Sequence, residues 1–236
     1  ALTVDYFNIK VKNVIGADAY GSVFDSCFGT NGATVDPAAC ARVHRDKFGS
    51  LWLTKDGYVV ILNRNFPGVG LATKGFDLNG SYSHRLGGFG TFNASFVGTI
   101  QGKTATVGSQ GTGTFSPDSI PSSKFRSKTR IGLTLPNGLG VSGAWRHFSS
   151  VKCAGSVNCL RPANVGIKAQ NYFDLAMTAR ITNKFNLRFG ANNILDRAPP
   201  VLGDQVLTGV NGSGNTYPQI YDALGRYMFA GVTVDF

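Results

Sequence analysis

The sequence predicts an all-β fold, and three observations support this prediction. Apolar and polar residues alternate with a period of two along much of the chain, as in strands that bury one face. Glycine is abundant, with 31 of 236 residues, whereas glutamate, which is common in surface helices, does not occur. The alternating segments are mostly longer than the roughly 5–6 residues that are usual for strands of soluble proteins.

The alternation defines each predicted strand in turn. In the first strand, Leu2, Val4 and Tyr6 alternate with Thr3 and Asp5. The later apolar sets are, in order, Phe76/Leu78/Tyr82, Phe92/Ala94/Phe96, Ile131/Leu133/Leu135, Val141/Gly143/Trp145, Phe173/Leu175/Met177, Phe185/Leu187/Phe189 and Met228/Ala230/Val232. The predicted strands cover residues 2–13, 70–85, 89–102, 125–135, 139–149, 171–181, 185–194 and 225–236.

The connections between these strands alternate between short and long. The short ones are 86–88, 136–138 and 182–184, and the long ones are 14–69, 103–124, 150–170 and 195–224. In an up-and-down sheet all tight turns then lie at one end, which is the layout of an outer-membrane β-barrel. The alternative, a soluble β-sandwich, would need more than half of its chain in loops at one end, which compact domains rarely have.

The predicted fold is therefore an antiparallel up-and-down transmembrane β-barrel of about eight strands, with short periplasmic turns and long extracellular loops. Within the 14–69 loop, residues 17–28 are expected to hold a short helix. A second helix is expected to open at Asp36-Pro37, with aspartate as N-cap and proline in the first turn. Residues 59–65 are expected to extend the second strand outward. The longest aliphatic run, 58–62, is far shorter than the roughly 20 residues of a membrane-spanning helix.

If the apolar face meets lipid, the polar face looks into the barrel lumen and carries an excess of positive charge. The lumen candidates are Lys128, Arg130, Arg146, Arg180 and Arg188, against Asp77, Asp174 and Asp235. The interior of an eight-stranded barrel is just filled by side chains, and burying unbalanced charge there is costly. A wider, watered or plugged lumen is therefore expected, of which these strands form a part. The alternative places several of these cations at the rims, in water near lipid phosphates.

Four cysteines form two local pairs within the predicted long loops, Cys27 with Cys40 and Cys153 with Cys159. Four cysteines allow three connectivities, and the local pairing would close each loop on itself in an extracytoplasmic location. Zinc is the competing interpretation. It is disfavoured because the sequence has no Cys-x-x-Cys motif and only His44 lies nearby.

Other function classes find little support. The formal net charge is +10, but the cations are scattered and form no basic patch interleaved with aromatic residues, so no nucleic-acid partner is expected. The glycine-rich stretch 108–114 lacks the Gly-Lys-Ser/Thr of a phosphate loop. His147 is followed by Ser149 and Ser150, but there is neither a positioned aspartate nor a nucleophile motif, so no enzyme activity, cofactor or metal is predicted. An outer-membrane hydrolase or acyltransferase remains the enzymatic alternative.

Several stretches have a more specific character. NYFDL at 171–175, LRFGANNILD at 187–196, Pro199-Pro200 and YPQIYDALGRY at 217–227 resemble the closing strands of TonB-dependent outer-membrane receptors. Two earlier stretches, 4–10 and 49–53, resemble an upstream barrel strand and loop of the same family.

The resemblance implies a receptor in the bacterial outer membrane that imports a scarce extracellular small molecule, such as a ferric siderophore. Members of the family have a barrel of about 22 strands filled by an N-terminal plug, and TonB supplies the energy through that plug. Residues 1–236 would be the C-terminal segment of this barrel, a single incomplete domain without plug or TonB box, with 14–69 as a long extracellular loop. The alternative is a complete small outer-membrane barrel with a binding or structural role.

The last predicted strand resembles the membrane-insertion signal of this family, which the barrel-assembly machinery reads as an unpaired strand edge. Its candidate residues are Tyr227, Gly231, Val232, Val234 and Phe236. The alternative is an ordinary closing strand that ends in an aromatic belt residue at the lipid interface.

Overall fold

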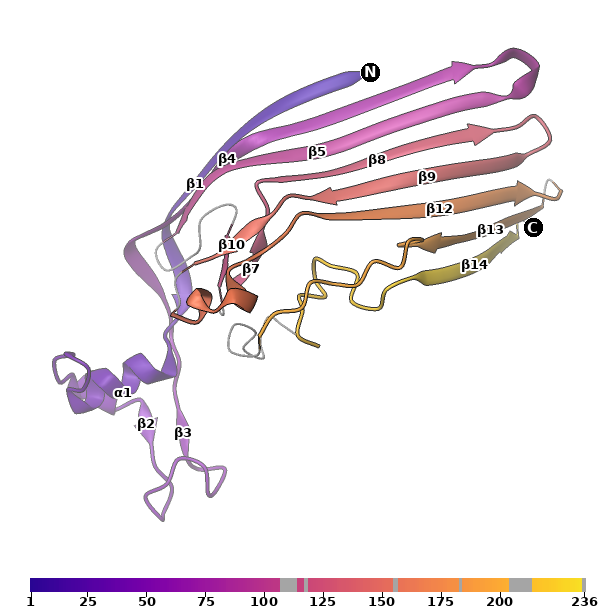
Figure 1. The fold of residues 1–236 in the computed structure, drawn as a ribbon. Coiled ribbons are helices and arrows are strands. Elements are labelled where there is room, and N and C mark those ends of the chain that lie inside the picture. The colour runs from indigo at the N-terminus through magenta and orange to yellow at the C-terminus, as the bar shows by residue number, and fades with distance from the viewer. Residues whose placement is uncertain (107–113, 117–118, 155–156, 183, 204–213, 235–236) are drawn as a thin grey trace. The chain divides into compact units, whose positions relative to one another are not determined.

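The computed structural model describes residues 1–106, 114–116, 119–154, 157–182, 184–203 and 214–234. Its main feature is an 8-stranded sheet in the order β1-β4-β5-β8-β9-β12-β13-β14 (Figure 1). Successive strands of this sheet are neighbours, as in an up-and-down arrangement, and the neighbouring strands from β5 to β14 pair antiparallel. The predicted fold class is confirmed.

All the predicted strands are present, with small differences at their ends. The strands of the large sheet are β1 Leu2–Ala17, β4 Asn63–Arg85, β5 Thr91–Thr106, β8 Phe125–Thr134, β9 Leu139–Phe148, β12 Gln170–Arg180, β13 Phe185–Asn192 and β14 Tyr227–Val234. β1 and β4 are longer than the alternation indicated, and β4 includes part of the predicted outward extension. Asp235 and Phe236 lie outside the described residues, as does most of the glycine-rich stretch 108–114.

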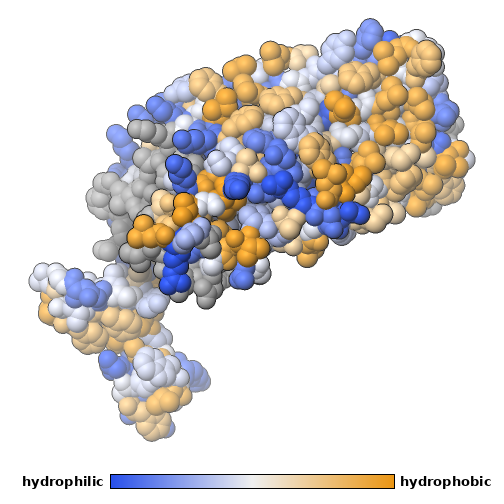
Figure 2. Space-filling model, viewed as in Figure 1, coloured by the Kyte–Doolittle hydropathy of each residue, from blue (hydrophilic) through white to orange (hydrophobic). Residues whose placement is uncertain are grey.

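The registers keep apolar side chains opposite one another on one face. Leu133 is the partner of Val141, and Trp145 is the partner of Phe173. Trp145 and Phe173 are 42% and 41% exposed, which a water-soluble sheet would avoid by covering this face. In Figure 2, hydrophobic side chains gather over the end of the sheet where β4 and β5 are joined. The apolar face is therefore suited to a hydrocarbon environment.

The three short connections are tight turns at one end of the sheet (Figure 1). β4 is joined to β5 through the 3-10 turn η1, Gly87–Phe89. In the next turn, Leu135 donates its N–H to the carbonyl of Leu139, and Gly138 has a φ of 83°. In the last turn, Ile181 N–H donates to Phe185 O, while Asn183 lies outside the described residues.

The long connections contain elements that the alternation did not indicate. Four short strands make a second sheet in the order β11-β10-β6-β7. They are β6 Thr114–Ser116, β7 Ser119–Ser122, β10 Val151–Cys153 and β11 Gly166–Ile167. Two 3-10 turns, η2 Val157–Leu160 and η3 Pro162–Asn164, lie between β10 and β11, and a disulfide joins Cys153 to Cys159.

Residues Val11–Leu71 form a compact unit of their own, separate from the unit of Ala1–Lys10 and Ala72–Phe236. The smaller unit contains the helices α1 Tyr20–Phe28 and α2 Pro37–Cys40 and the strand pair β2 Val43–His44 and β3 Tyr58–Val59. Both predicted helices are confirmed, and the carboxylate of Asp36 caps α2 by accepting from the N–H of Ala38.

The smaller unit is held together by covalent and ionic links. A disulfide joins Cys27 in α1 to Cys40 in α2. Arg42 forms an ion pair with Asp18 at 2.8 Å and donates to the carbonyl of Val60, so that one side chain links three parts of the unit. No helix in the part of the chain that the structure describes is both long and apolar enough to cross a membrane.

Candidate functional site

The five cations predicted to face the lumen share one face of the large sheet, which we call the polar face. Cross-strand partners project their side chains to the same side of a sheet. Lys128 is the partner of Arg146, Arg146 is also the partner of Tyr172, and Thr178 on the same strand is the partner of Arg188. The other two cations lie two residues from Lys128 and Thr178, and side chains two residues apart share a face. They are Arg130 and Arg180.

One of these cations is held by two carboxylates in a group that we call the ion cluster, formed by Arg146, Asp174 and Asp222. Nε and Nη2 of Arg146 donate to the two oxygens of Asp174, both at 2.9 Å, and Nη1 donates to Asp222 at 2.9 Å. The guanidinium group lies 5.0 Å from the ring centroid of Tyr172, in cation–π contact. Charge-assisted pairs of this kind are strong. Arg146 therefore has few donors left for a ligand.

The connection that follows β13 is tied to the ion cluster at its start. The backbone N–H of Asn193 donates to Asp174 at 3.0 Å. The buried Asn193 side chain both accepts from and donates to the backbone of Arg197, and its φ of 51° is one that asparagine adopts more readily than most residues. Arg197 Nε donates to Gln170 at 2.7 Å. These bonds turn the chain back toward the sheet at the end of β13.

The same connection packs against the sheet through buried aromatic side chains. Tyr217 and Tyr221 belong to a hydrophobic cluster that includes Tyr172 on the polar face of β12. The other members are Phe115, Val151, Ile167 and Leu202. Burial raises the pKa of Tyr217 to about 12 and raises that of Tyr221 as well. Both phenols are therefore neutral at physiological pH and suit an apolar environment.

A cavity of about 530 Å³ adjoins the ion cluster. Besides the cluster residues, its lining includes Lys128, Asn192, Tyr221 and Tyr227. Among the described residues, none forms a salt bridge with Lys128, whereas the other cation in the lining, Arg146, is neutralised by two carboxylates. The ammonium group of Lys128 nevertheless interacts electrostatically with Asp174, and the two cations of the lining are matched by two carboxylates. Lys128 is exposed and is the cation of this cavity that a ligand can reach.

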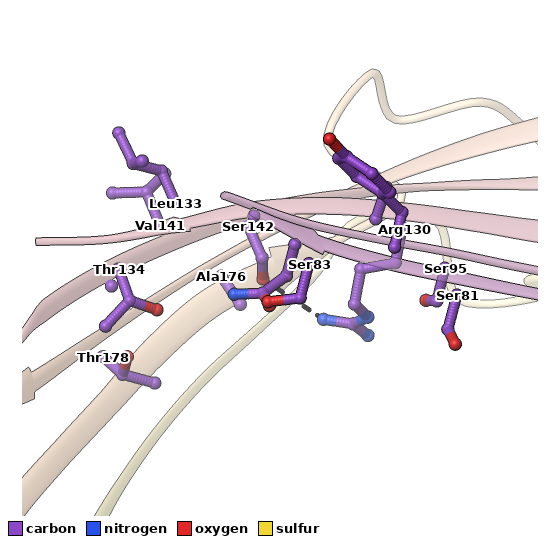
Figure 3. A pocket seen from close by; sticks show the side chains of 15 residues that line it. Ser81, Ser83, Ser95, Arg130, Leu133, Thr134, Val141, Ser142, Ala176 and Thr178 are labelled. Atoms are coloured by element: carbon purple, nitrogen blue, oxygen red, sulfur yellow. Dashed lines mark hydrogen bonds between the residues drawn. The ribbon is translucent and has the colours of Figure 1, made fainter. Parts of the chain in front are cut away.

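The remaining predicted cations lie apart from the ion cluster. The guanidinium group of Arg188 lies 5.1 Å from the ring centroid of Phe229. Arg180 lies beside a short turn, where its backbone N–H donates to Gly138. Arg130 Nη1 donates to the hydroxyl of Ser142 at 3.2 Å (Figure 3). Within the described part of the chain, none of these three arginines forms a salt bridge.

Sequence reasoning missed the residues of the long connection that complete this site. Asp222, Asn193 and Gln170 lie beyond or at the edge of the alternating segments, so no periodicity marks their orientation. Asp222 and Asn193 do occur in the stretches that carry the family resemblance. The resemblance could therefore have marked these two residues as important, but it did not indicate which residues they contact.

His147 and Ser149, which the enzymatic alternative would bring together, have other hydrogen-bond partners in the structure. His147 Nδ1 lies 2.8 Å from the side-chain oxygen of Asn171, which also accepts from Trp145. The hydroxyl of Ser149 instead accepts from the backbone N–H of Phe125. No hydrogen bond joins His147 to Ser149 in the described residues. In the same part of the chain, no three histidine, cysteine or acidic side chains gather as they would around a metal ion.

The residues of the predicted insertion signal lie on both faces of β14, which is an edge strand of the sheet. Tyr227 and Gly231 are opposite Asn192 and Arg188, so they share the polar face. Val232 and Val234 lie on the apolar face, where Val232 is 63% exposed. Phe236, the last residue of the predicted signal, lies outside the described residues.

Solved structures with the same fold include a ferric enterobactin receptor and a copper transporter. A mutant of the ferric enterobactin receptor PfeA from Pseudomonas aeruginosa, in complex with enterobactin, has a TM-score of 0.57 and 13% sequence identity. The copper transporter OprC has a TM-score of 0.53 and 13% identity. FpvA from P. aeruginosa, bound to heterologous pyoverdines, has a TM-score of 0.51 and 14% identity.

These matches cover 100% of this chain but only 29% of the PfeA and OprC chains and 24% of the FpvA chain. The chain thus spans less than a third of the length of the structures that it matches. No curated protein sequence matches it. A family model described as "TonB dependent receptor-like, beta-barrel" matches residues 1–194. The chain belongs to the TonB-dependent receptor family, whose known members are receptors and transporters, and it contributes β-barrel strands of that family.

Proposed function

We propose that the chain is the C-terminal barrel portion of an outer-membrane receptor that imports a scarce ligand, such as a ferric siderophore, with energy from TonB. The observation that carries this proposal is the two-sided character of the large sheet. One face exposes large apolar side chains, and the opposite face carries arginine and lysine side chains without salt bridges among the described residues. Lipid on the first side and a watered lumen on the second satisfy both faces.

The edges of the sheet support membership in a larger barrel. β1 and β14 lie at opposite edges of the strand order (Figure 1). A complete small barrel, the alternative function, requires these two strands to pair with each other, because closure is what removes exposed edges in a membrane. Further strands of a longer receptor would satisfy both edges. TonB would then act through a plug in that longer protein.

The connections from β5 to β8, from β9 to β12 and from β13 to β14 begin at the end of the sheet opposite the tight turns, and in this proposal they face the outside of the cell. The unit of residues 11–71 would form a further extracellular loop. Its disulfide, and the disulfide between Cys153 and Cys159, suit a location outside the cytoplasm. The edge strand β14 would be the strand that the barrel-assembly machinery recognises.

The unpaired cations of the polar face would attract an anionic ligand or pair with carboxylates of the plug. Lys128 in the cavity and Arg188 on β13 are the side chains best placed for this, since Arg146 is already neutralised. Replacing Lys128 and Arg188 by aspartate should weaken ligand binding at low ionic strength and weaken it less at high salt. Lys184→Asp, in an exposed short turn, is the matched control.

The direct test is uptake of radioactive iron by the natural host, supplied as ferric enterobactin under iron limitation. Deleting the gene should reduce uptake, the intact gene should restore it, and a protonophore should abolish the restored uptake. Uptake of glucose serves as the control for general damage to the membrane. If deletion leaves uptake of ferric enterobactin and of a panel of other ferric siderophores unchanged, siderophore transport is wrong for this protein.

A further inference from the structure

A second cavity lies on the polar face, between the ion cluster and the short turns. It has a volume of about 410 Å³ and is lined by residues of β4, β5, β8, β9 and β12. Three lining positions on the polar face carry no large side chain, namely Gly132, Gly140 and Ala176. An added Cβ at Gly140 would lie 2.5 Å from the hydroxyl of Thr178. Small residues at these positions therefore open the space beside Arg130.

Among the described residues that line this cavity, Arg130 is the only one with a charged side chain. The side chain is half-buried, and within the described part of the chain it donates to Ser142 alone, so most of the five N–H donors of the guanidinium group have no partner there. Arg146 lies on the neighbouring strand, two positions from Ala144, which is the cross-strand partner of Arg130. In contrast to Arg130, Arg146 forms salt bridges with two carboxylates. Since no described residue that lines this cavity has a carboxylate, the carboxylate of a ligand would balance the charge of Arg130.

Several hydroxyl groups line the same cavity as Arg130. Figure 3 shows Ser81, Ser95 and Ser142 on the side of the sheet to which this group points, whereas Leu133 and Val141 project to the opposite side. Ser83, Thr134 and Thr178 also line the cavity. Hydroxyls donate hydrogen bonds to oxyanions without adding charge. The site thus offers one positive charge, a planar pair of N–H donors and several neutral donors.

We propose that this cavity is a carboxylate-binding site. Arg130 would make a two-point contact with the carboxylate, and the serine and threonine hydroxyls would donate to its remaining lone pairs. One guanidinium charge matches one carboxylate, whereas a doubly charged phosphate would remain half-neutralised. Access to the site rests on the proposed function, which places the polar face in a watered lumen, but detecting the site does not require uptake to be measured.

The carboxylate has two possible sources, a small acid in solution or an acidic side chain of the receptor itself. A carbodiimide distinguishes the two sources in the variant Arg130→Lys. The reagent condenses the lysine amine with a carboxylate that contacts this amine, which forms an amide, and the reagent takes up the released water. The variant is expressed in its natural host and kept in isolated membranes with isotopically labelled acetate. The matched control is Arg126→Lys, which lies on the same face and strand but outside the cavity.

Mass spectrometry should show that the introduced amine of Arg130→Lys is coupled at least ten-fold more than that of Arg126→Lys. A cross-link to an acidic residue identifies a protein segment as the occupant, and labelled acetate identifies a solute. A cross-link to glutamate would prove that the segment lies outside these residues, because this sequence has none. Equal coupling in the two variants, or none in either, would overturn the site. The two proposals can fail separately. If Arg130→Lys shows the ten-fold excess of coupling while deletion of the gene leaves siderophore uptake intact, the carboxylate site is upheld and the proposed transport is rejected.

The unchanged protein provides a second measurement, should Arg130→Lys fail to fold. Phenylglyoxal modifies free guanidinium groups, and a bound carboxylate protects them. Modification of Arg130 should be at least five-fold slower than that of Arg126, or become so when acetate is added. If Arg130 reacts as fast as Arg126 with and without acetate, no carboxylate occupies the cavity.

Discussion

Asp222 is the residue that ties the connection between β13 and β14 to the sheet by charge. Its carboxylate accepts from Arg146, while Asp174 accepts both from Arg146 and from the backbone of Asn193. Asp174 would remain to neutralise the guanidinium group if Asp222 were lost. The sheet should therefore survive removal of this charge, and the effect should be confined to the connection.

Asp222→Asn should loosen the connection without unfolding the sheet. Loss of one hydrogen bond to a charged group costs about 1.5–3 kcal/mol, which corresponds to a more than ten-fold drop in amide protection. Hydrogen exchange measured by mass spectrometry should show this drop for residues 217–225 and little change in β9 and β12. Asp56→Asn, at an exposed position, is the control. Unchanged protection at 217–225 would show that the aromatic cluster alone holds the connection.

Asp46 organises a turn in the smaller unit and should make that turn sensitive to acid. Burial alone would raise the pKa of Asp46, but hydrogen bonds from the backbone N–H groups of Ser50, Phe48 and Thr54 outweigh it and lower the pKa below the ordinary 3.8. A lowered pKa means that the stabilisation is complete above the ordinary value and is lost as pH falls through the lowered one.

Amide protection of residues 48–54 should therefore stay constant from about pH 7 to pH 5 and fall below about pH 4. Hydrogen exchange, corrected for the intrinsic effect of pH, measures this. Asp46→Asn should show weaker protection that no longer depends on pH in this range. A protection profile of the unchanged protein that is flat down to about pH 2 would show that the carboxylate does not hold the turn.

At the scale of single elements, the tight turns fix the registers of the strands. Gly138 joins β8 to β9 with a φ of 83°, a conformation that costs other residues about 1–2 kcal/mol. An added Cβ would also lie 3.0 Å from the Cβ of Arg180, the last residue of the neighbouring strand β12. The first effect strains the turn between β8 and β9, and the second disturbs its contact with β12.

Gly138→Val should lower the free energy of unfolding by at least about 2 kcal/mol, since a β-branched residue suffers most at positive φ. The urea midpoint for the protein in detergent micelles measures the change. Gly88→Ala, in the short turn between β4 and β5, is the control, because its added Cβ would have no atom within 4 Å. An equal midpoint for Gly138→Val and the unchanged protein would contradict the assigned turn geometry.

The elements differ in how well the sequence predicted them, for a physical reason. Strands of the large sheet have one apolar and one polar face, so the period of two predicts where they lie and which face each side chain joins, as for Trp145 and Arg146. It does not fix every end, since β1 and β4 continue beyond the alternating residues. The short strand β10 packs within a folded loop and is too brief to show a period. Asp222 depends on a contact with Arg146 across 76 residues, which no local pattern reveals.

At the scale of the whole molecule, the alternation of apolar and polar residues indicates which environment each face of the large sheet meets. The family match and the solved structures establish barrel strands of a TonB-dependent receptor, while the identity of the ligand is proposed from the family. The central claim is that the apolar face meets lipid and the polar face meets water. All four cysteines of this sequence are in disulfides, so an introduced thiol would be the only free one within these 236 residues.

The most direct test is therefore a scan of single cysteines along β8 in isolated outer membranes. A membrane-impermeant maleimide should label cysteines at Lys128 and Arg130 rapidly and those at Thr129 and Ile131 slowly, with a period of two. A lipid-soluble maleimide should show the opposite order. Rapid labelling at all four positions by the water-soluble reagent would contradict a lipid-facing sheet, and with it the placement of the chain in a membrane barrel.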